Sequence, residues 1–181
     1  GGAESRGSSL YVHTASRVNT FQAGSSINLN GSQDVDLFGA VVSGGTITEN
    51  GVDMTLPGGS SISVVAGQQV FIDTGLLASK LIDIDAGEAG ADDDRLSLII
   101  TPAGGAFAAG QTSDSSGGRV NIDVATDLEI MGNVLAGGLL TQTFDDDGNL
   151  LTESTTWHET NSEAHVTAGG QAFIGGNTVN A

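Results

Sequence analysis

Apolar and polar residues alternate along short stretches of the chain, and glycine-rich or polar corners separate these stretches. Such alternation is typical of β-strands with one buried face. In three segments it recurs at identical spacings: a second apolar residue follows the first after eight positions, and a third follows after six more. The three sets are Ile27, Val35 and Val41; Ile62, Val70 and Leu76; Val120, Leu128 and Val134. Such an internal repeat indicates one structural unit used several times.

The length of the repeat predicts a coiled stack of strands. Ile27 and Ile47 are 20 positions apart, as are Ile62 and Ile82, and this length holds three short strands with three corners. No window of the sequence carries the apolar stripe of an amphipathic helix. The predicted fold class is therefore all-β, a parallel β-helix (β-solenoid) with hairpin or loop insertions.

Further stretches are expected to be equivalent within this repeat. Residues 46–48 match residues 81–84, and residues 139–141 hold the same place in the third unit. Residues 52–59 resemble residues 96–105, since in both a proline at the end of a strand precedes a glycine pair. All of these stretches are expected to be strands of the stack.

Side chains at equivalent positions are expected to form columns, because each rung of such a stack lies directly on the one below. Three inward columns are predicted: Ile27, Ile62 and Val120; Val35, Val70 and Leu128; Leu37, Ile72 and Ile130. Two outward columns follow from the alternation: Asn28, Ser63 and Asn121; Asp36, Phe71 and Glu129. The outward positions are mostly polar, as a solvated face requires.

The repeat motif resembles that of a known family. It reads Gly-Gly/Ser-x-Ile/Val-x-Ile/Leu, then a gap, then Val/Leu-x-Ile/Leu-x-Gly-x-Val-x-Ala-Gly-Gly, and residues 118–138 match it best. This pattern is similar to the repeats of filamentous haemagglutinin-type, two-partner-secreted bacterial adhesins. The likeness covers roughly residues 23–140 and returns at residues 168–174.

The resemblance implies a right-handed β-helix in the shaft of a large adhesin or filament, secreted to the bacterial surface. The implied role is attachment or display. The implied partners are a glycan or protein of a host or neighbouring cell, or further copies in a filament. No enzymatic activity is expected, and no cofactor is required.

Composition narrows the possible partners. Five Lys and Arg residues stand against 22 Asp and Glu residues, which gives a net charge of −17. This balance argues against nucleic acid and against anionic membrane surfaces, since both need a basic face. Cysteine is absent, and no apolar run reaches the length of a membrane span, so no membrane insertion is expected.

The sequence divides into four expected parts. Residues 1–22 are a polar N-terminal or edge segment, and residues 23–142 form the rungs, with an insertion near residues 88–95. Residues 143–167 are a protruding hairpin or loop insertion, and residues 168–181 continue the rungs. Insertions in a repeat protein lie on its faces and often carry binding functions.

The second insertion contains a candidate calcium site. Asp145, Asp147 and Asn149 surround Gly148 and resemble the oxygen-rich core of a calcium loop, although the distant acidic residue of an EF-hand is absent. The same residues equally suit the turn of a β-hairpin. Residues 92–94 with Arg95 present the same two alternatives, calcium site or solvated turn.

Other residues suggest chemistry more weakly. Asp83 and Asp85 would share the outward face of one strand, with Asp73 as a possible neighbour, which raises the alternative of a carbohydrate-active β-helix. His158 and His165 could meet across a hairpin, whereas His13 lies far away in the sequence, and no zinc spacing is present. The single tryptophan could anchor a partner or pin the insertion to the stack. The alternative function is thus a carbohydrate-active or calcium-stabilised β-helix module.

Overall fold

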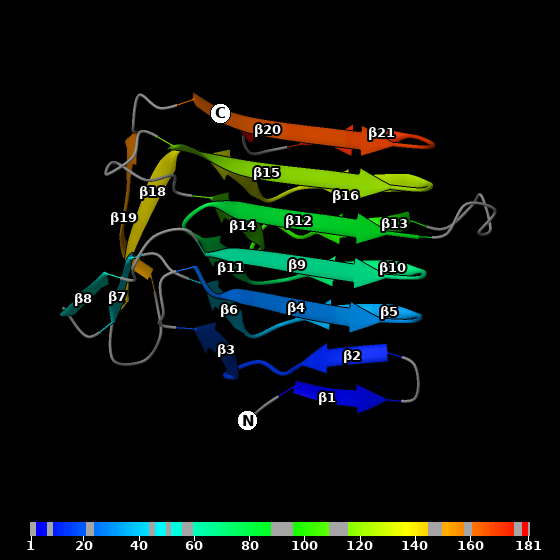
Figure 1. Ribbon diagram of the computed structural model, residues 1–181, viewed down its shortest axis with the longest axis horizontal. Coiled ribbons are helices and arrows are strands. Elements are labelled where there is room, and N and C mark those ends of the chain that lie inside the picture. Colours follow the sequence, from blue (N-terminus) through cyan, green and yellow to red (C-terminus); the bar gives the residue numbers. More distant parts are fainter. Residues whose placement is uncertain are drawn as a thin grey trace.

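The computed structural model describes the chain except at residues 1–2, 7–8, 21–23, 44–45, 50–51, 56–59, 88–95, 109–115, 145–149, 158–160, 176–178 and 181. Within the described residues every regular element is a β-strand and none is a helix. Most strands belong to three parallel sheets, A, B and C, and the other strands form two antiparallel hairpins (Figure 1). The predicted all-β class with parallel sheets is confirmed.

Each sheet takes strands from successive passes of the chain. Sheet C contains β4 (Ser26–Gly31), β9 (Ser61–Ala66), β12 (Leu81–Ala86), β15 (Ser116–Val124) and β20 (Asn161–Ala168). Sheet A contains β2 (Ser9–Val12), β5 (Asp34–Leu37), β10 (Gln69–Ile72), β13 (Leu96–Ile100), β16 (Asp127–Ile130) and β21 (Ala172–Ile174). Sheet B contains β3 (Arg17–Thr20), β6 (Ala40–Ser43), β11 (Gly75–Ala78), β14 (Gly105–Ala108), β17 (Asn133–Ala136) and β22 (Val179–Asn180).

One pass of the chain contributes a strand to sheet C, then to sheet A, then to sheet B, and we call such a set a rung. For example, β4, β5 and β6 form one rung, and β9, β10 and β11 form the next. Strands of neighbouring rungs pair in parallel, because the chain returns to each sheet in the same direction. At the N-terminal end β1 (Ala3–Arg6) departs from this rule and pairs antiparallel with β2.

The core lies between the three sheets and consists of stacked aliphatic columns. Ile27, Ile62, Ile82 and Val120 are direct partners on successive strands of sheet C, and all are buried. The other two predicted inward columns are also confirmed, and each gains one residue from β13: Val35, Val70, Leu98 and Leu128; Leu37, Ile72, Ile100 and Ile130. Full burial of each such side chain contributes about 1.5–3 kcal/mol.

Two hairpins interrupt the rungs. β7 (Thr46–Glu49) pairs antiparallel with β8 (Val52–Thr55), and β18 (Gly138–Phe144) pairs antiparallel with β19 (Leu150–Trp157). The expected equivalence of residues 46–48 and 139–141 with residues 81–84 is therefore wrong, as is that of residues 52–59 with β13. A hairpin strand and a rung strand share the same period of two, so alternation alone does not separate them.

The rungs extend beyond the expected limits. β2 and β3, within residues 1–22, pair in parallel with β5 and β6 and so form part of a rung. β20 lies largely within residues 143–167 and pairs in parallel with β15. The interruption before β20 consists of β18 and β19, and it begins at Gly138, where β18 begins.

The outer face of sheet B is covered rather than solvated. Val42, Phe107 and Leu135 occupy outward positions on β6, β14 and β17, yet they are only 4%, 8% and 5% exposed. β18 lies beside β14 and β7. Sheet B therefore carries apolar side chains on both faces, and its outer face is not an open binding surface.

Candidate functional site

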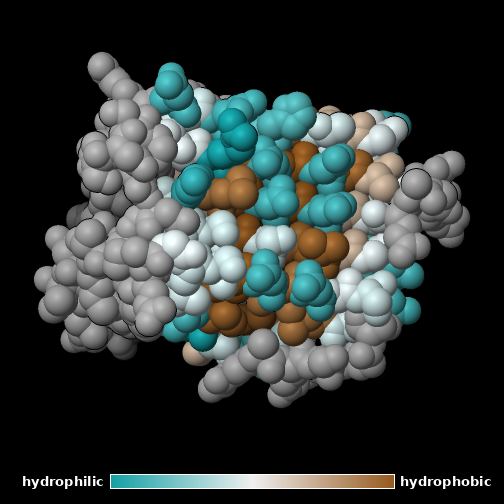
Figure 2. Space-filling view, viewed as in Figure 1, coloured by the Kyte–Doolittle hydropathy of each residue, from teal (hydrophilic) through white to brown (hydrophobic). Residues whose placement is uncertain are grey.

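The outer face of sheet C carries mostly polar side chains in a regular array. Alternation places every second residue of each strand outward. The outward side chains form three columns in register: Ser26, Ser61, Leu81, Arg119 and Glu163; Asn28, Ser63, Asp83, Asn121 and His165; Asn30, Val65, Asp85, Asp123 and Thr167. Hydrophilic side chains lie across this face (Figure 2).

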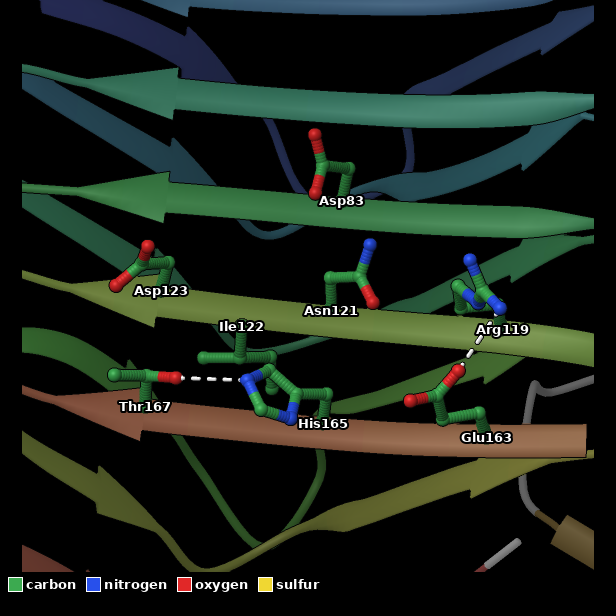
Figure 3. A pocket seen from close by; sticks show the side chains of 8 residues that line it. All are labelled: Asp83, Arg119, Asn121, Ile122, Asp123, Glu163, His165 and Thr167. Atoms are coloured by element: carbon green, nitrogen blue, oxygen red, sulfur yellow. Dashed lines mark hydrogen bonds and ion pairs between the residues drawn. The ribbon is translucent and has the colours of Figure 1, made fainter.

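The last three strands of this face carry a shallow groove of about 370 Å³, which we call the sheet C groove. Its lining residues are Asp83, Arg119, Asn121, Ile122, Asp123, Glu163, His165 and Thr167 (Figure 3). They come from β12, β15 and β20. Ile122 is fully buried on the inner side of the sheet, so the polar residues around it supply the chemistry of the groove.

Two side-chain interactions cross or line the groove. Arg119 Nη2 lies 2.9 Å from Glu163 Oε2 on the neighbouring strand, and the two side chains are 57% and 55% exposed. At this exposure an ion pair contributes about 0–1 kcal/mol to stability, so its main effect is to fix both side chains at one end of the groove. Thr167 Oγ1 and His165 Nε2 are 3.1 Å apart on the same strand.

Three carboxylates lie together here: Asp83 and Asp123 line the groove, and Asp85 lies next to them. Asp85 and Asp123 are direct partners on β12 and β15, and Asp83 precedes Asp85 by two positions on the same face. Burial raises the pKa of Asp85 above its ordinary value, and the negative charges of Asp123 and Asp83 raise this pKa further. The electrostatic potential at this part of sheet C is therefore negative.

Several residues singled out from the sequence are separated by the fold. Asp83 and Asp85 do share one outward face, as predicted. Asp73 lies at the corner between sheets A and B, where its carboxylate accepts a hydrogen bond from the Thr101 hydroxyl, so it does not join them. His13 follows β2 and packs edge-on against Tyr11 with ring centroids 4.6 Å apart, whereas His165 lies on β20.

The insertions hold the remaining candidates. Asp145, Asp147 and Asn149 lie outside the described residues, as do Asp92, Asp93, Asp94, Arg95 and His158. The backbone of Trp157 pairs with Gly138 at the base of the β18–β19 hairpin. Among the described residues, no group of three or more His, Asp or Glu side chains is arranged to hold a metal ion. The calcium site thus remains a prediction from the sequence.

Most of the groove was not predicted from the sequence. The alternation predicts that Asn121 points outward, but it does not single out Arg119, Asp123, Glu163 or Thr167. The information that identifies these residues is the register between neighbouring strands. Once Leu81 is aligned with Arg119, each outward residue of β12 acquires a defined neighbour on β15. Long and unequal connections between these strands hide this register.

No protein-family model, curated protein or solved structure matches the chain. In the part of the chain that the structure describes, no helix has the length and apolar character to cross a membrane.

Proposed function

We propose that the chain is a shaft segment of a large secreted bacterial surface adhesin or filament, folded as a right-handed parallel β-helix. The observation that supports this most directly is the in-register stacking of rungs around one aliphatic core. A stack of this kind gains length by adding rungs without changing its cross-section, since each rung contacts only its neighbours. Such a stack is suited to spacing and displaying a binding surface.

The outer surface supports a role in attachment. The outer face of sheet C is polar and regular, and the sheet C groove offers hydrogen-bonding groups to a ligand. The resemblance of the repeat to filamentous haemagglutinin-type adhesins adds the proposed location at the bacterial surface. The proposed partners are a glycan or protein of a host or neighbouring cell, or further copies of the chain.

Attachment and surface location can be tested together. Intact cells of the bacterium that encodes the chain are labelled with an antibody raised against it, and beads coated with the purified chain are incubated with epithelial or bacterial cells. We expect labelling of intact cells and retention of the beads. Labelling that requires cell lysis, or beads that no cell type retains, would contradict the proposal.

The bead experiment has a matched control. An Ile82→Asp variant places a charge at a fully buried position, which prevents stacking while leaving the composition almost unchanged. Beads that carry this variant should be retained less than beads that carry the original chain. Equal retention of the two would show that adhesion comes from general charge and not from the folded surface.

A carbohydrate-active module is a second candidate, favoured by the cluster of Asp83, Asp85 and Asp123 and by the raised pKa of Asp85. Glycosidases use a pair of carboxyl groups, one of which has a raised pKa and acts as the general acid. Release of reducing ends from a panel of polysaccharides, and its loss in Asp85→Asn, would support this candidate. No release from any polysaccharide would remove it.

A calcium-stabilised module is the other alternative, and it depends on Asp145, Asp147 and Asn149. Its test is the melting temperature with and without millimolar Ca²⁺, since a ligand that binds only the folded state raises it. A variant with Asp145→Asn and Asp147→Asn should lose any shift. An unchanged melting temperature would rule out stabilisation by Ca²⁺.

A further inference from the structure

The sheet C groove presents polar groups at the fixed spacings of a parallel sheet. Asp83, Asn121 and His165 form one outward column across β12, β15 and β20. Asp123 and Thr167 lie two positions further along their strands and form a second row. Neighbours across the strands are about 4.8 Å apart, and neighbours along one strand are about 6.6 Å apart. The groove is therefore a flat array of hydrogen-bonding groups.

The charges in this array are unequal. The guanidinium of Arg119 is paired with Glu163, so the one positive charge of the lining is already compensated. The remaining charged groups of the lining, Asp83 and Asp123, are both negative. The raised pKa of Asp85, which lies next to Asp123, reports the same negative potential. The groove should attract a cationic group and repel an acidic one.

The uncharged groups of the lining suit hydroxyls. The Asn121 amide both donates and accepts hydrogen bonds, as does the Thr167 hydroxyl, and the His165 ring adds two further nitrogen atoms that form hydrogen bonds. A hydroxyl group likewise both donates and accepts, so a ligand with several hydroxyls can match this array. Figure 3 shows Asn121 and Asp123 on β15 beside His165 and Thr167 on β20, which places these groups along one lined area of the sheet.

We propose that the sheet C groove binds an amino-sugar oligosaccharide. Its ammonium groups lie against the carboxylates of Asp83 and Asp123, and its hydroxyls bond to Asn121, His165 and Thr167. The inference rests on the proposed role in attachment and gives that role a ligand class and a location. Acidic saccharides are excluded by the same carboxylates that bind the amino groups.

The test is a titration of the isotopically labelled full chain with a glucosamine hexamer at about pH 7, where amino groups remain largely protonated. We expect NMR shifts of the Asn121 side-chain amide and of the His165 ring. Under the same conditions the N-acetylated hexamer should bind more weakly, and a galacturonic acid hexamer should give no shift. Absence of shifts with the glucosamine hexamer, or equal shifts with the galacturonic acid hexamer, would overturn the inference.

Two variants separate the groove from the general negative charge of the chain. Asp123→Asn removes one charge from the groove and should weaken glucosamine hexamer binding about three- to five-fold, the range expected for an exposed ion pair. Glu129→Gln removes one charge from the outer column of sheet A in the same rung and should leave binding unchanged. Equal effects of both variants would show nonspecific attraction and overturn the groove assignment.

Failure of the ligand assignment can be distinguished from failure of the proposed function. If beads that carry the chain are retained by cells while the glucosamine hexamer gives no shift, attachment stands and the ligand assignment is wrong. If the hexamer binds while no cell type retains the beads, the groove is a saccharide site and the adhesin proposal is wrong.

Discussion

Ile62 and Ile82 are direct partners on β9 and β12, although 20 positions separate them in the sequence, and both side chains are fully buried. This pair shows how a rung is closed. The chain leaves sheet C, contributes β10 to sheet A and β11 to sheet B, and returns to place Ile82 directly against Ile62. The stability of the stack therefore depends on contacts between residues one pass apart.

Ile82→Ala should destabilise the protein strongly. Truncation of a fully buried isoleucine leaves a cavity between rungs and costs about 2–5 kcal/mol in the free energy of unfolding. The control is Val65→Ala on the neighbouring strand, since Val65 points outward and is 37% exposed, and its loss should cost about 0.5 kcal/mol or less. Urea denaturation measures both. Similar losses for the two variants would contradict the assignment of inward and outward columns.

Gly132→Ala tests the corner between sheets A and B. A Cβ at this position would overlap the carbonyl oxygens of Gly104 and Thr101, which belong to the backbone of the rung below and cannot rotate away. We expect a loss of about 1–3 kcal/mol, measured by thermal unfolding. Gly75→Ala is the control, because the nearest atom to its added Cβ would be Phe107 Cε2 at 3.9 Å. A tolerated Gly132→Ala would mean that the corners are not closely stacked.

Phe107→Ala should cost more than its outward position suggests. Phe107 is 8% exposed because the outer face of sheet B is covered, so its loss should cost about 3–5 kcal/mol. Phe71 occupies the outward position on β10 and is only half-buried, with its ring 5.3 Å from that of Phe38. Phe71→Ala should cost about 1–2 kcal/mol. Urea denaturation measures both losses of stability. A larger loss in Phe71→Ala than in Phe107→Ala would contradict the burial of the outer face of sheet B.

The pH dependence of stability should carry a contribution from Asp85. Its pKa is raised in the folded state, so the folded state binds this proton more tightly than the unfolded state. The stabilising contribution is full below the unfolded pKa and is lost as the pH rises through the folded pKa. Asp85→Asn should therefore raise the urea midpoint at neutral pH and change it little in acid.

A second variant tests what raises the pKa of Asp85. Asp123→Asn removes the negative charge on the neighbouring strand, so the pKa of Asp85 should fall toward its ordinary value. An NMR titration of the Asp85 carboxyl measures this directly. An unchanged pKa in Asp123→Asn would show that burial and Asp83 account for the shift without Asp123, and would weaken the case for a negative potential beside the groove.

The inward columns could be predicted from the sequence because burial requires the same residue type at each pass. Val35, Val70 and Leu128 are aliphatic for this reason, and their spacing from the preceding strand is constant. Leu98 was missed in this column, because the irregular register between β13 and β16 and the long connection before β13 obscure the repeat.

The hairpins and the groove could not be predicted in the same way. Ile47 lies between polar neighbours just as Ile62 does, yet it pairs with Met54 in a hairpin. The distinction depends on which strand lies opposite, and a single sequence does not contain that information. The groove likewise depends on the meeting of Arg119 with Glu163 across β15 and β20, which only the register reveals.

Both hairpins that interrupt the described rungs leave at the same corner, between a strand of sheet B and the next strand of sheet C. β12 pairs with β9 after a direct return from β11, whereas β20 pairs with β15 after the whole β18–β19 hairpin, and the inward partners still meet. Added length at this corner thus changes the surface of the molecule and leaves the pairing between successive rungs unchanged. Foreign peptides could be grafted at this corner, and the strands of the rungs on either side should still pair.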